Sequence, residues 1–166
     1  MPHQLDPLDL TLIETLTAHP RSGPLELSRL IRVARATVAA RLQRLEEAGV
    51  ITGYGPDVEL VEAGFPVRAF VTLEIAQGGL GDVADELAAI PNVLEAHAVT
   101  GTGDIVCHVA ARSHADLQDV LVALNSSPAI VRSTSVIALS TVVPHRVLPL
   151  LRTSVRAGGT RAPHYR

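Results

Sequence analysis

Two apolar stretches in the second half of the chain, Val93–Val99 and Ile105–Arg112, are joined by only five residues, Thr100-Gly-Thr-Gly-Asp104. Parallel neighbouring strands need a crossover of a dozen or more residues, whereas antiparallel strands need only a tight turn. The two stretches are therefore expected to form an antiparallel hairpin. This constraint excludes an all-parallel sheet for the second half of the chain.

The segments around this hairpin alternate between strand and helix periodicity. Val67–Ile75 alternates apolar and polar side chains, as a half-buried strand does, and Ile130–Val143 predicts a last long strand. Two helical patterns complete the set, one from Leu80 to Ile90 and one ending at Leu124. The resulting order, β-α-β-β-α-β, is that of the split, ferredoxin-like unit.

The first half of the chain shows three short helical patterns instead. Asp6 is a predicted N-cap, Pro24 opens a second helix, and a third runs from about Arg35 to Ala48 before Gly49. Two apolar pieces around a Gly-Pro-Asp turn in Val50–Leu60 predict a small β-hairpin, or wing. The chain is therefore predicted to be an α+β protein with an N-terminal winged helix-turn-helix.

These patterns predict four parts. Residues 1–55 form the winged helix-turn-helix, 56–66 a linker, and 67–150 the ferredoxin-like domain. Residues 151–166 are rich in Arg, Gly and Pro and have little to bury, so this tail is expected to be disordered. No apolar run approaches 18 residues and no signal peptide follows Met1, which favours a cytoplasmic protein without a membrane partner. The single Cys107 excludes an intrachain disulfide framework.

Charge is strongly segregated along the chain. Residues 20–45 hold six Arg against one acid, Glu26, giving a local net charge of +5 in a chain whose net charge is −3. Residues 46–126 hold 13 acids against two Arg. Phosphates attract a basic helix-turn-helix, while the acidic segment stays off the nucleic acid. The sequence therefore predicts a module that binds double-stranded DNA.

The third helix supplies most of the expected DNA contacts. Its inward stripe is Val38, Leu42 and Leu45, so the opposite face is available to the major groove. Small side chains there let the backbone approach base edges, polar residues of the first turn can reach bases, and flanking arginines suit phosphates. The alternative is a solvated basic face whose arginines pair with Glu46 or Glu47. The residues expected to contact DNA are Arg21, Arg32, Arg35, Ala36, Thr37, Ala40, Arg41 and Arg44.

Several motifs occur together, in one order and at one spacing. The N-terminal ones are Leu5-Asp6-x-x-Asp9-x-x-x-Ile13 and Thr37-Val38-x-x-Arg41-Leu42-x-Arg44-Leu45-Glu46-x-x-Gly49-Val50-Ile51-x-Gly53-Tyr54. The later ones are Gly64, Val99-Thr100-Gly101-x-x-Asp104, Pro128, and Ser133-x-Ser135 with Leu139. Over about residues 5–150 the chain thereby resembles the leucine-responsive and asparagine-responsive (Lrp/AsnC) regulators. It departs from them at Arg32, where the family usually has Gly, at Ala34, where it has a capping Ser, and at Ala129, commonly Gly.

The resemblance implies a sequence-specific DNA-binding transcriptional regulator that is not an enzyme and uses no cofactor. Its C-terminal domain would sense an amino acid or related metabolite and assemble homodimers, up to an octamer. Two short helices can cover only one face of a four-stranded sheet, which also favours pairing of the second face with another subunit. The residues implied for the effector site are Gly101, Thr102, Gly103 and Asp104, with Ser133 and Ser135 from a neighbouring subunit.

Other functions have weaker support in the sequence. Sirohaem decarboxylases share the two-domain plan, but only His97 and His108 hint at a tetrapyrrole pocket, and such enzymes need no basic recognition helix. A sensor without DNA binding is disfavoured by the +5 segment. The Gly79-Leu-Gly81 stretch superficially fits a dinucleotide fingerprint but lacks a parallel βαβ unit. His97, Cys107 and His108 could meet on one hairpin as metal ligands. No Gly-x-Ser-x-Gly elbow for nucleophilic catalysis is present.

Overall fold

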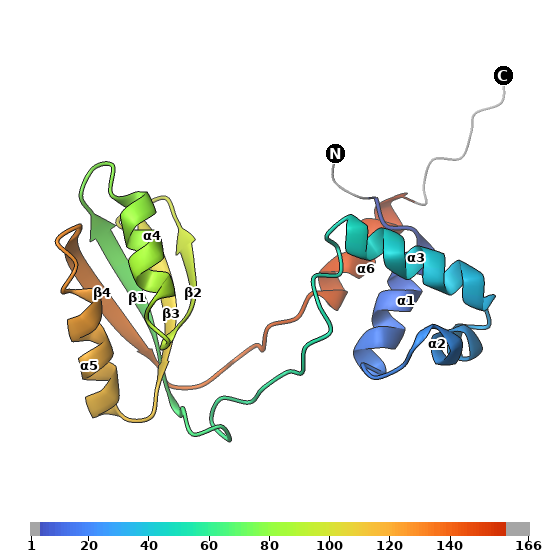
Figure 1. The fold of residues 1–166 in the computed structure, drawn as a ribbon, viewed down its shortest axis with the longest axis horizontal. Coiled ribbons are helices and arrows are strands. Elements are labelled where there is room, and N and C mark those ends of the chain that lie inside the picture. The colour runs from blue at the N-terminus through green and yellow to red at the C-terminus, as the bar shows by residue number, and fades with distance from the viewer. Residues whose placement is uncertain (1–3, 159–166) are drawn as a thin grey trace. The chain divides into compact units, whose positions relative to one another are not determined.

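The structure, a computed structural model, describes residues 4–158 and divides them into two compact units (Figure 1). The first unit combines residues 4–56 with residues 144–158, so it is built from both ends of the chain. The second unit comprises residues 57–143. The second unit begins at residue 57 and ends at residue 143, whereas the predicted ferredoxin-like domain spanned residues 67–150 after a linker of residues 56–66.

Three helices begin the first unit: α1 (Pro7–Ala18), α2 (Pro24–Ile31) and α3 (Arg35–Glu47). The α1 helix starts as predicted, because the Asp6 carboxylate accepts hydrogen bonds from the backbone N–H of Leu8 (2.8 Å) and Asp9 (2.9 Å). The three helices share one small core of side chains that lie at helical spacing in the sequence. Its buried members are Leu12, Leu27, Val38 and Leu42.

The turn between α2 and α3 has a backbone that its sequence does not favour. Arg32 caps α2 in the left-handed conformation, with φ 57° and ψ 42°, and it is the only non-glycine residue between residues 4 and 158 with positive φ. Ala34 is the N-cap of α3 and offers no side-chain hydrogen bond. Two of the three departures from the Lrp/AsnC pattern, Arg32 and Ala34, therefore lie at the two ends of one turn, where glycine and serine would each suit the backbone better.

The wing hairpin expected for Val50–Leu60 is not formed. The structure describes no strand between α3 and the first strand of the second unit. Instead, the backbone N–H groups of Val50 and Ile51 return to the Leu45 carbonyl (2.9 and 3.1 Å), and the Tyr54 hydroxyl donates to Glu46 Oε1 (2.5 Å). An isolated two-stranded hairpin is marginal in water, and these contacts bind the segment to α3 rather than to itself.

The prediction of a disordered tail over residues 151–166 was wrong for its first half. Helix α6 (Leu148–Gly158) contacts α1, and Arg152 Nε lies 2.6 Å from Glu14 Oε1. Leu148, Leu151 and Val155 are half-buried and follow helical spacing, so few apolar residues suffice where α1 offers a surface. The predicted tail beyond residue 158 lies outside the described residues.

The second unit has the predicted β-α-β-β-α-β order: β1 (Val67–Ile75), α4 (Leu80–Ala88), β2 (Val93–Ala98), β3 (Ile105–Ala111), α5 (His114–Leu124) and β4 (Ile130–Ala138). The sheet order is β2-β3-β1-β4, and every pairing is antiparallel. The five-residue connection joins β2 to β3, as its length required. The last strand ends at Ala138 rather than at Val143.

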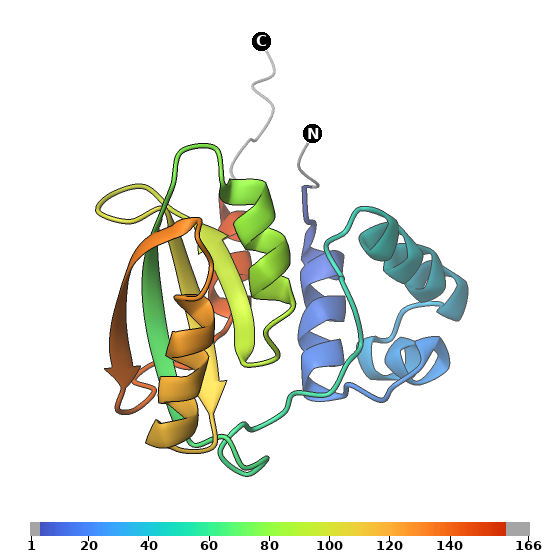
Figure 2. The same ribbon diagram turned by 60° about the vertical axis from the view of Figure 1, so that its left-hand side comes forward.

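Helices α4 and α5 cover one face of the sheet, as Figures 1 and 2 show. On β1, alternate residues from Val67 to Leu73 are buried beneath these helices and share one core with Val83 and Leu87 of α4 and with three residues of α5. The β1 residues between them, among them Phe70, point to the other face. That face has no helix over it within residues 57–143 and remains open.

The predicted linker, residues 56–66, belongs mostly to this second unit. Residues 60–64 form a turn in which the Phe65 N–H donates to the Leu60 carbonyl (2.8 Å), and Gly64 takes a φ of +93°. The Arg112 guanidinium lies over the Phe65 ring, 5.5 Å from its centroid. These contacts attach residues 57–66 to the sheet and leave the junction at Pro56.

Candidate nucleic-acid interface and ligand site

The exposed face of α3 carries an open hollow of about 470 Å³. The three inward residues named from the sequence, Val38, Leu42 and Leu45, are buried, which turns the opposite face outward. Five of the predicted DNA contacts come together as the lining of this hollow: Ala36, Thr37, Ala40, Arg41 and Arg44. The lining of this open hollow thus combines two alanines, one threonine hydroxyl and two guanidinium groups.

Arg41 and Arg44 both form ion pairs with carboxylates at the start of α1. Arg41 Nη1 contacts carboxylate oxygens of both Asp6 and Asp9, the latter at 3.0 Å. Arg44 Nη2 lies 2.8 Å from both oxygens of Asp9. The sequence offered Glu46 and Glu47 as alternative partners, but those bond to Tyr54 and Gln43. The arginines therefore pair across the fold with α1, which sequence spacing along one helix could not reveal.

The carboxylates of Asp6 and Asp9 are also hydrogen-bonded to the backbone at the start of α1. The Asp9 side chain is fully buried, and Asp9 Oδ2 accepts the Asp6 backbone N–H at 3.1 Å, completing a capping box. Burial opposes ionisation of Asp6, but hydrogen bonds from Arg41 and from the Asp9 backbone outweigh it, so the pKa of Asp6 lies below its ordinary value. The hydrogen bonds that Arg41 donates to the Asp6 and Asp9 carboxylates raise the pKa of Arg41.

The other predicted contacts lie outside the hollow lining. Arg21 is exposed in the turn before α2, Arg32 is exposed in the turn after it, and Arg35 is exposed in the first turn of α3. None of the three has an ion-pair partner among residues 4–158. Their charges are thus uncompensated, in contrast to those of Arg41 and Arg44.

The Gly101–Asp104 connection is fixed to the end of β1. The Asp104 backbone N–H donates to the Leu73 carbonyl, and Asp104 Oδ2 accepts the Ile75 N–H, both at 2.8 Å. A Cβ at Gly103 would lie 2.3 Å from Thr72 Cγ2, so the close approach requires glycine. Gly101 has a φ of +121°, and Thr102 is exposed. The loop thus has a structural role that its turn-forming glycines only partly predicted.

Ser133 and Ser135 lie at the edge strand β4, opposite Leu73 and Val71 in register. The Asp104 loop meets β1 from its other side, at the same Leu73. Within one subunit, β1 therefore separates the serines from the loop at a shared end of the sheet. Ser135 is exposed and Ser133 half-exposed, so both remain accessible from the edge.

The histidines and cysteine of the hairpin do not converge. Cys107 is buried in the core, and burial raises the pKa of its thiol to about 11. His108 stacks on Phe70 on the open face, with ring centroids 4.8 Å apart, and both His108 and His97 contact Glu95. No group of three side chains suited to a metal ion occurs among residues 4–158. No helix in that range could span a membrane.

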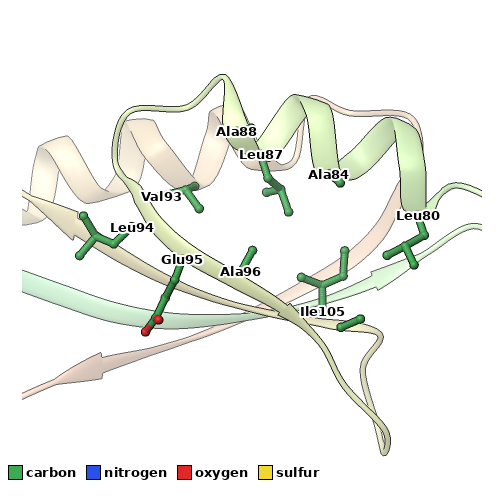
Figure 3. Close-up of a pocket in the computed structure, with 10 residues that line it drawn as sticks. Leu80, Ala84, Leu87, Ala88, Val93, Leu94, Glu95, Ala96 and Ile105 are labelled. Atoms are coloured by element: carbon green, nitrogen blue, oxygen red, sulfur yellow. The ribbon is translucent and has the colours of Figure 1, made fainter. Parts of the chain in front are cut away.

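A pocket that sequence analysis missed lies between α4 and the edge strand β2 (Figure 3). It measures about 300 Å³ and is lined by small and apolar residues and by one charged residue, Glu95. Ala84 and Ala88 of α4 face Ala96 and Ala98 of β2, and four alanines at such positions leave space where larger side chains would fill the layer. Only the pairing of α4 with β2 brings them together, so no local pattern predicts the pocket.

Two family models match the chain. One described as a winged helix-turn-helix DNA-binding domain matches residues 5–52, and one described as the Lrp/AsnC ligand binding domain matches residues 68–148. The HTH-type transcriptional regulator Rv2324 of Mycobacterium tuberculosis is 31% identical over 144 residues, which cover 84% of this chain and 95% of the relative.

Solved structures agree with this assignment. AsnC of E. coli superposes with a TM-score of 0.82 at 26% identity, covering 89% of this chain and all of that one. A transcriptional regulator from Neisseria meningitidis, solved as a complex with L-Met, shares the fold with a TM-score of 0.81 at 24% identity, over 90% of this chain and 99% of that one. With both of its domains matched in order, this chain belongs to the Lrp/AsnC family of DNA-binding transcriptional regulators.

Proposed function

We propose that this regulator recognises its operator through the exposed face of α3. The observation that carries the proposal is the hollow lined by Ala36, Thr37, Ala40, Arg41 and Arg44, which joins small side chains, a hydroxyl and two guanidinium groups on one outward face. Thr37 is placed to contact a base edge, and Arg35 to reach a base or phosphate. Arg21 and Arg32 supply further phosphate contacts from the flanking turns.

The test begins with duplex fragments that the protein selects from sheared genomic DNA. Thr37→Ala is expected to change the preferred base at one position of the selected site, at a cost of about 1–3 kcal/mol in binding free energy there. Arg21→Ala should instead weaken selected and unrelated duplexes alike and reduce the salt slope by about one unit. Unchanged binding by both variants would exclude α3 and its flanks as the contact surface.

We further propose that the second unit senses an amino acid at the Gly101–Asp104 loop, with Ser133 and Ser135 contributed by an adjoining dimer. The description of the matched model as a ligand binding domain supports a ligand, and the Asp104 carboxylate suits an α-ammonium group. Because one oxygen of that carboxylate already accepts the Ile75 N–H, the ligand would share the carboxylate with β1.

The decisive variant is Asp104→Asn, which keeps an oxygen acceptor for the Ile75 N–H but removes the charge. Binding would be measured by calorimetry, first with L-methionine, which the Neisseria meningitidis regulator carries, and then with the other amino acids. Asp104→Asn should lose ligand binding while its thermal stability and its operator binding without ligand stay near those of the wild type. Normal ligand binding by the variant would locate the site elsewhere.

The open face of the sheet is proposed to assemble the subunits, as a dimer that associates further, up to an octamer. Phe70 and Val136 are neighbours in register on that face and are both exposed in the single chain. Two-fold assembly would place two helix-turn-helix units on one pseudo-palindromic operator, with half-sites one helical turn apart or a multiple of it.

We propose no enzymatic activity. The relative matched is named as a transcriptional regulator, and the helix-turn-helix matches a DNA-binding model. His97 and His108, the candidate tetrapyrrole contacts, both contact Glu95. Adding sirohaem should therefore cause no shift of its Soret band; a stoichiometric shift would revive the decarboxylase alternative.

A further inference from the structure

The basic segment of the sequence is less basic in the folded protein than its composition suggests. Of the six arginines between residues 20 and 45, Arg41 and Arg44 each contact both Asp6 and Asp9. Two positive charges that line the α3 hollow are thus matched by two negative charges in contact with them. The net charge of this four-residue cluster is zero, although the cluster borders the surface proposed to meet DNA.

The contacts with Asp6 and Asp9 hold the two arginine side chains but use only some of their N–H donors. Arg41 uses only Nη1 and Arg44 only Nη2 in these contacts, whereas a guanidinium carries five N–H donors on three nitrogens. The Arg44 side chain keeps 47% of its surface exposed, and Arg41 25%. Each arginine is therefore anchored at one nitrogen and still able to donate to a phosphate from another.

The two carboxylates are themselves hydrogen-bonded to the backbone at the start of α1. Asp9 is fully buried in the first turn of α1, and the two side chains cap each other's backbone. Asp6 Oδ1 accepts two backbone N–H groups, while Asp6 Oδ2 is the atom that contacts Arg41. The orientation of both guanidinium groups is consequently set by the N-terminus of α1, more than 30 residues away in sequence.

We propose that Asp6 and Asp9 are positioning residues for DNA recognition: they orient Arg41 and Arg44 for the operator and cancel charge that would otherwise bind any duplex. The inference rests on the proposed role of α3. An oriented guanidinium loses little conformational freedom when it meets a phosphate in the right place. An unpaired arginine adapts to phosphates in any register, which raises binding to all DNA alike. The acidic pair thereby favours discrimination over affinity.

The experiment compares Asp6→Asn with the wild type on two probes: the duplex selected from sheared genomic DNA and a random-sequence duplex of equal length. Asparagine also caps helices, so α1 keeps its start while Arg41 loses a charged partner. On random DNA, Asp6→Asn should bind several-fold more tightly, with a salt slope steeper by up to about 0.9. The ratio of selected to random affinity should fall roughly fivefold or more, the effect of one lost base contact.

Three further variants separate positioning from charge and from folding. Glu14→Gln makes the same charge change on the same helix, but Glu14 contacts Arg152 rather than the cluster, so it should leave the affinity ratio unchanged. Arg44→Lys keeps the charge and loses the two-oxygen contact with Asp9; it should retain random binding and weaken selected binding. Asp9→Asn, at a fully buried position, is used only if its melting temperature stays near that of the wild type.

The inference is overturned if Asp6→Asn leaves both the ratio and the salt slope unchanged, or if Glu14→Gln reproduces its effects. Equal weakening of both probes with a lowered melting temperature would assign Asp6 a folding role only. If Thr37→Ala and Arg21→Ala leave DNA binding intact, the proposed α3 surface fails and this inference fails with it. If those variants act as expected and Asp6→Asn does not, only the positioning role is lost.

Discussion

At the scale of single residues, Arg32 is the position where the sequence conflicts most with the backbone. Its left-handed conformation costs an L-residue about 1–2 kcal/mol, and glycine avoids that cost. Arg32→Gly is therefore expected to unfold in urea with a free energy about 1 kcal/mol higher than Arg32→Ala, which removes the same charge but keeps the strain. Equal stability of the two variants would show that the turn relaxes in solution.

The lowered pKa of Asp6 makes the free energy of unfolding depend on pH in the acidic range. Its pKa is lowered in the folded state, so the unfolded chain takes up its proton first as the pH falls. The stability that ionised Asp6 contributes is complete above its ordinary pKa of 3.8 and is lost as the pH falls through the lower folded pKa. Asp6→Asn should thus be less stable than the wild type at pH 7, with the difference shrinking below about pH 4. Urea midpoints across this range measure it; a constant difference would contradict the linkage.

At this scale, contacts within one helix could be predicted from the sequence, whereas contacts between elements could not. Asp6 as N-cap was confirmed, since a cap is a contact within three residues. The exposed face of α3 followed from Val38, Leu42 and Leu45, whose spacing alone buries one side of the helix. The pairing of Arg44 with Asp9 could not be predicted, because it depends on how α1 crosses α3. The role of Gly103 likewise depends on Thr72, in another strand.

At the scale of elements, the same distinction explains which helices and strands were predicted correctly. Val67–Ile75 was confirmed residue for residue, because its alternation is carried through the buried face of a central strand. Residues 5–52 match a winged helix-turn-helix model, but the β-hairpin expected for Val50–Leu60 is not formed, because Val50, Ile51 and Tyr54 bond to residues of α3 instead. Helix α6 was missed because composition hid its spacing: Arg and Pro residues surround only three half-buried side chains.

Helix α6 leads to a prediction about the first unit. Its half-buried Leu151 supports contact with α1, whereas the Arg152–Glu14 pair is solvent-exposed and such pairs are worth about 0–1 kcal/mol. Leu151→Ala should lower the free energy of unfolding by about 1 kcal/mol, and Arg152→Ala by clearly less. Urea unfolding of both full-length variants provides the comparison. A larger effect of Arg152→Ala would mean that charge, not apolar contact, attaches the helix.

At the scale of the whole molecule, both ends of the chain join the helix-turn-helix unit, while the sheet unit is one continuous segment, residues 57–143. The sheet unit therefore connects to the DNA-binding unit through two chain segments rather than one. A ligand that reorganises the sheet unit would act on both segments together. We therefore expect the sheet unit to carry both the assembly surface and the ligand site.

The open face gives the sharpest test of assembly. Val136 is 63% exposed on that face, next to Phe70, whereas Val122 on α5 is 64% exposed elsewhere in the same unit. Since neither valine contributes to the core of the single chain, aspartate at either position should leave the fold intact. Val136→Asp should dissociate the assembly to monomers, because a buried unpaired carboxylate is costly at an interface, while Val122→Asp should not.

Light scattering at micromolar concentration would report these masses. The wild type and Val122→Asp should be at least dimeric, and Val136→Asp monomeric. Because a monomer offers one recognition helix to an operator with two half-sites, Val136→Asp should also bind the selected duplex more weakly while binding random DNA through the same basic surface. A monomeric wild type would refute assembly altogether. If Val136→Asp keeps the mass of the wild type, the interface lies on a surface other than the open sheet face. Leu139 and Val142, which follow β4 and are 96% and 90% exposed, would then be the next residues to test.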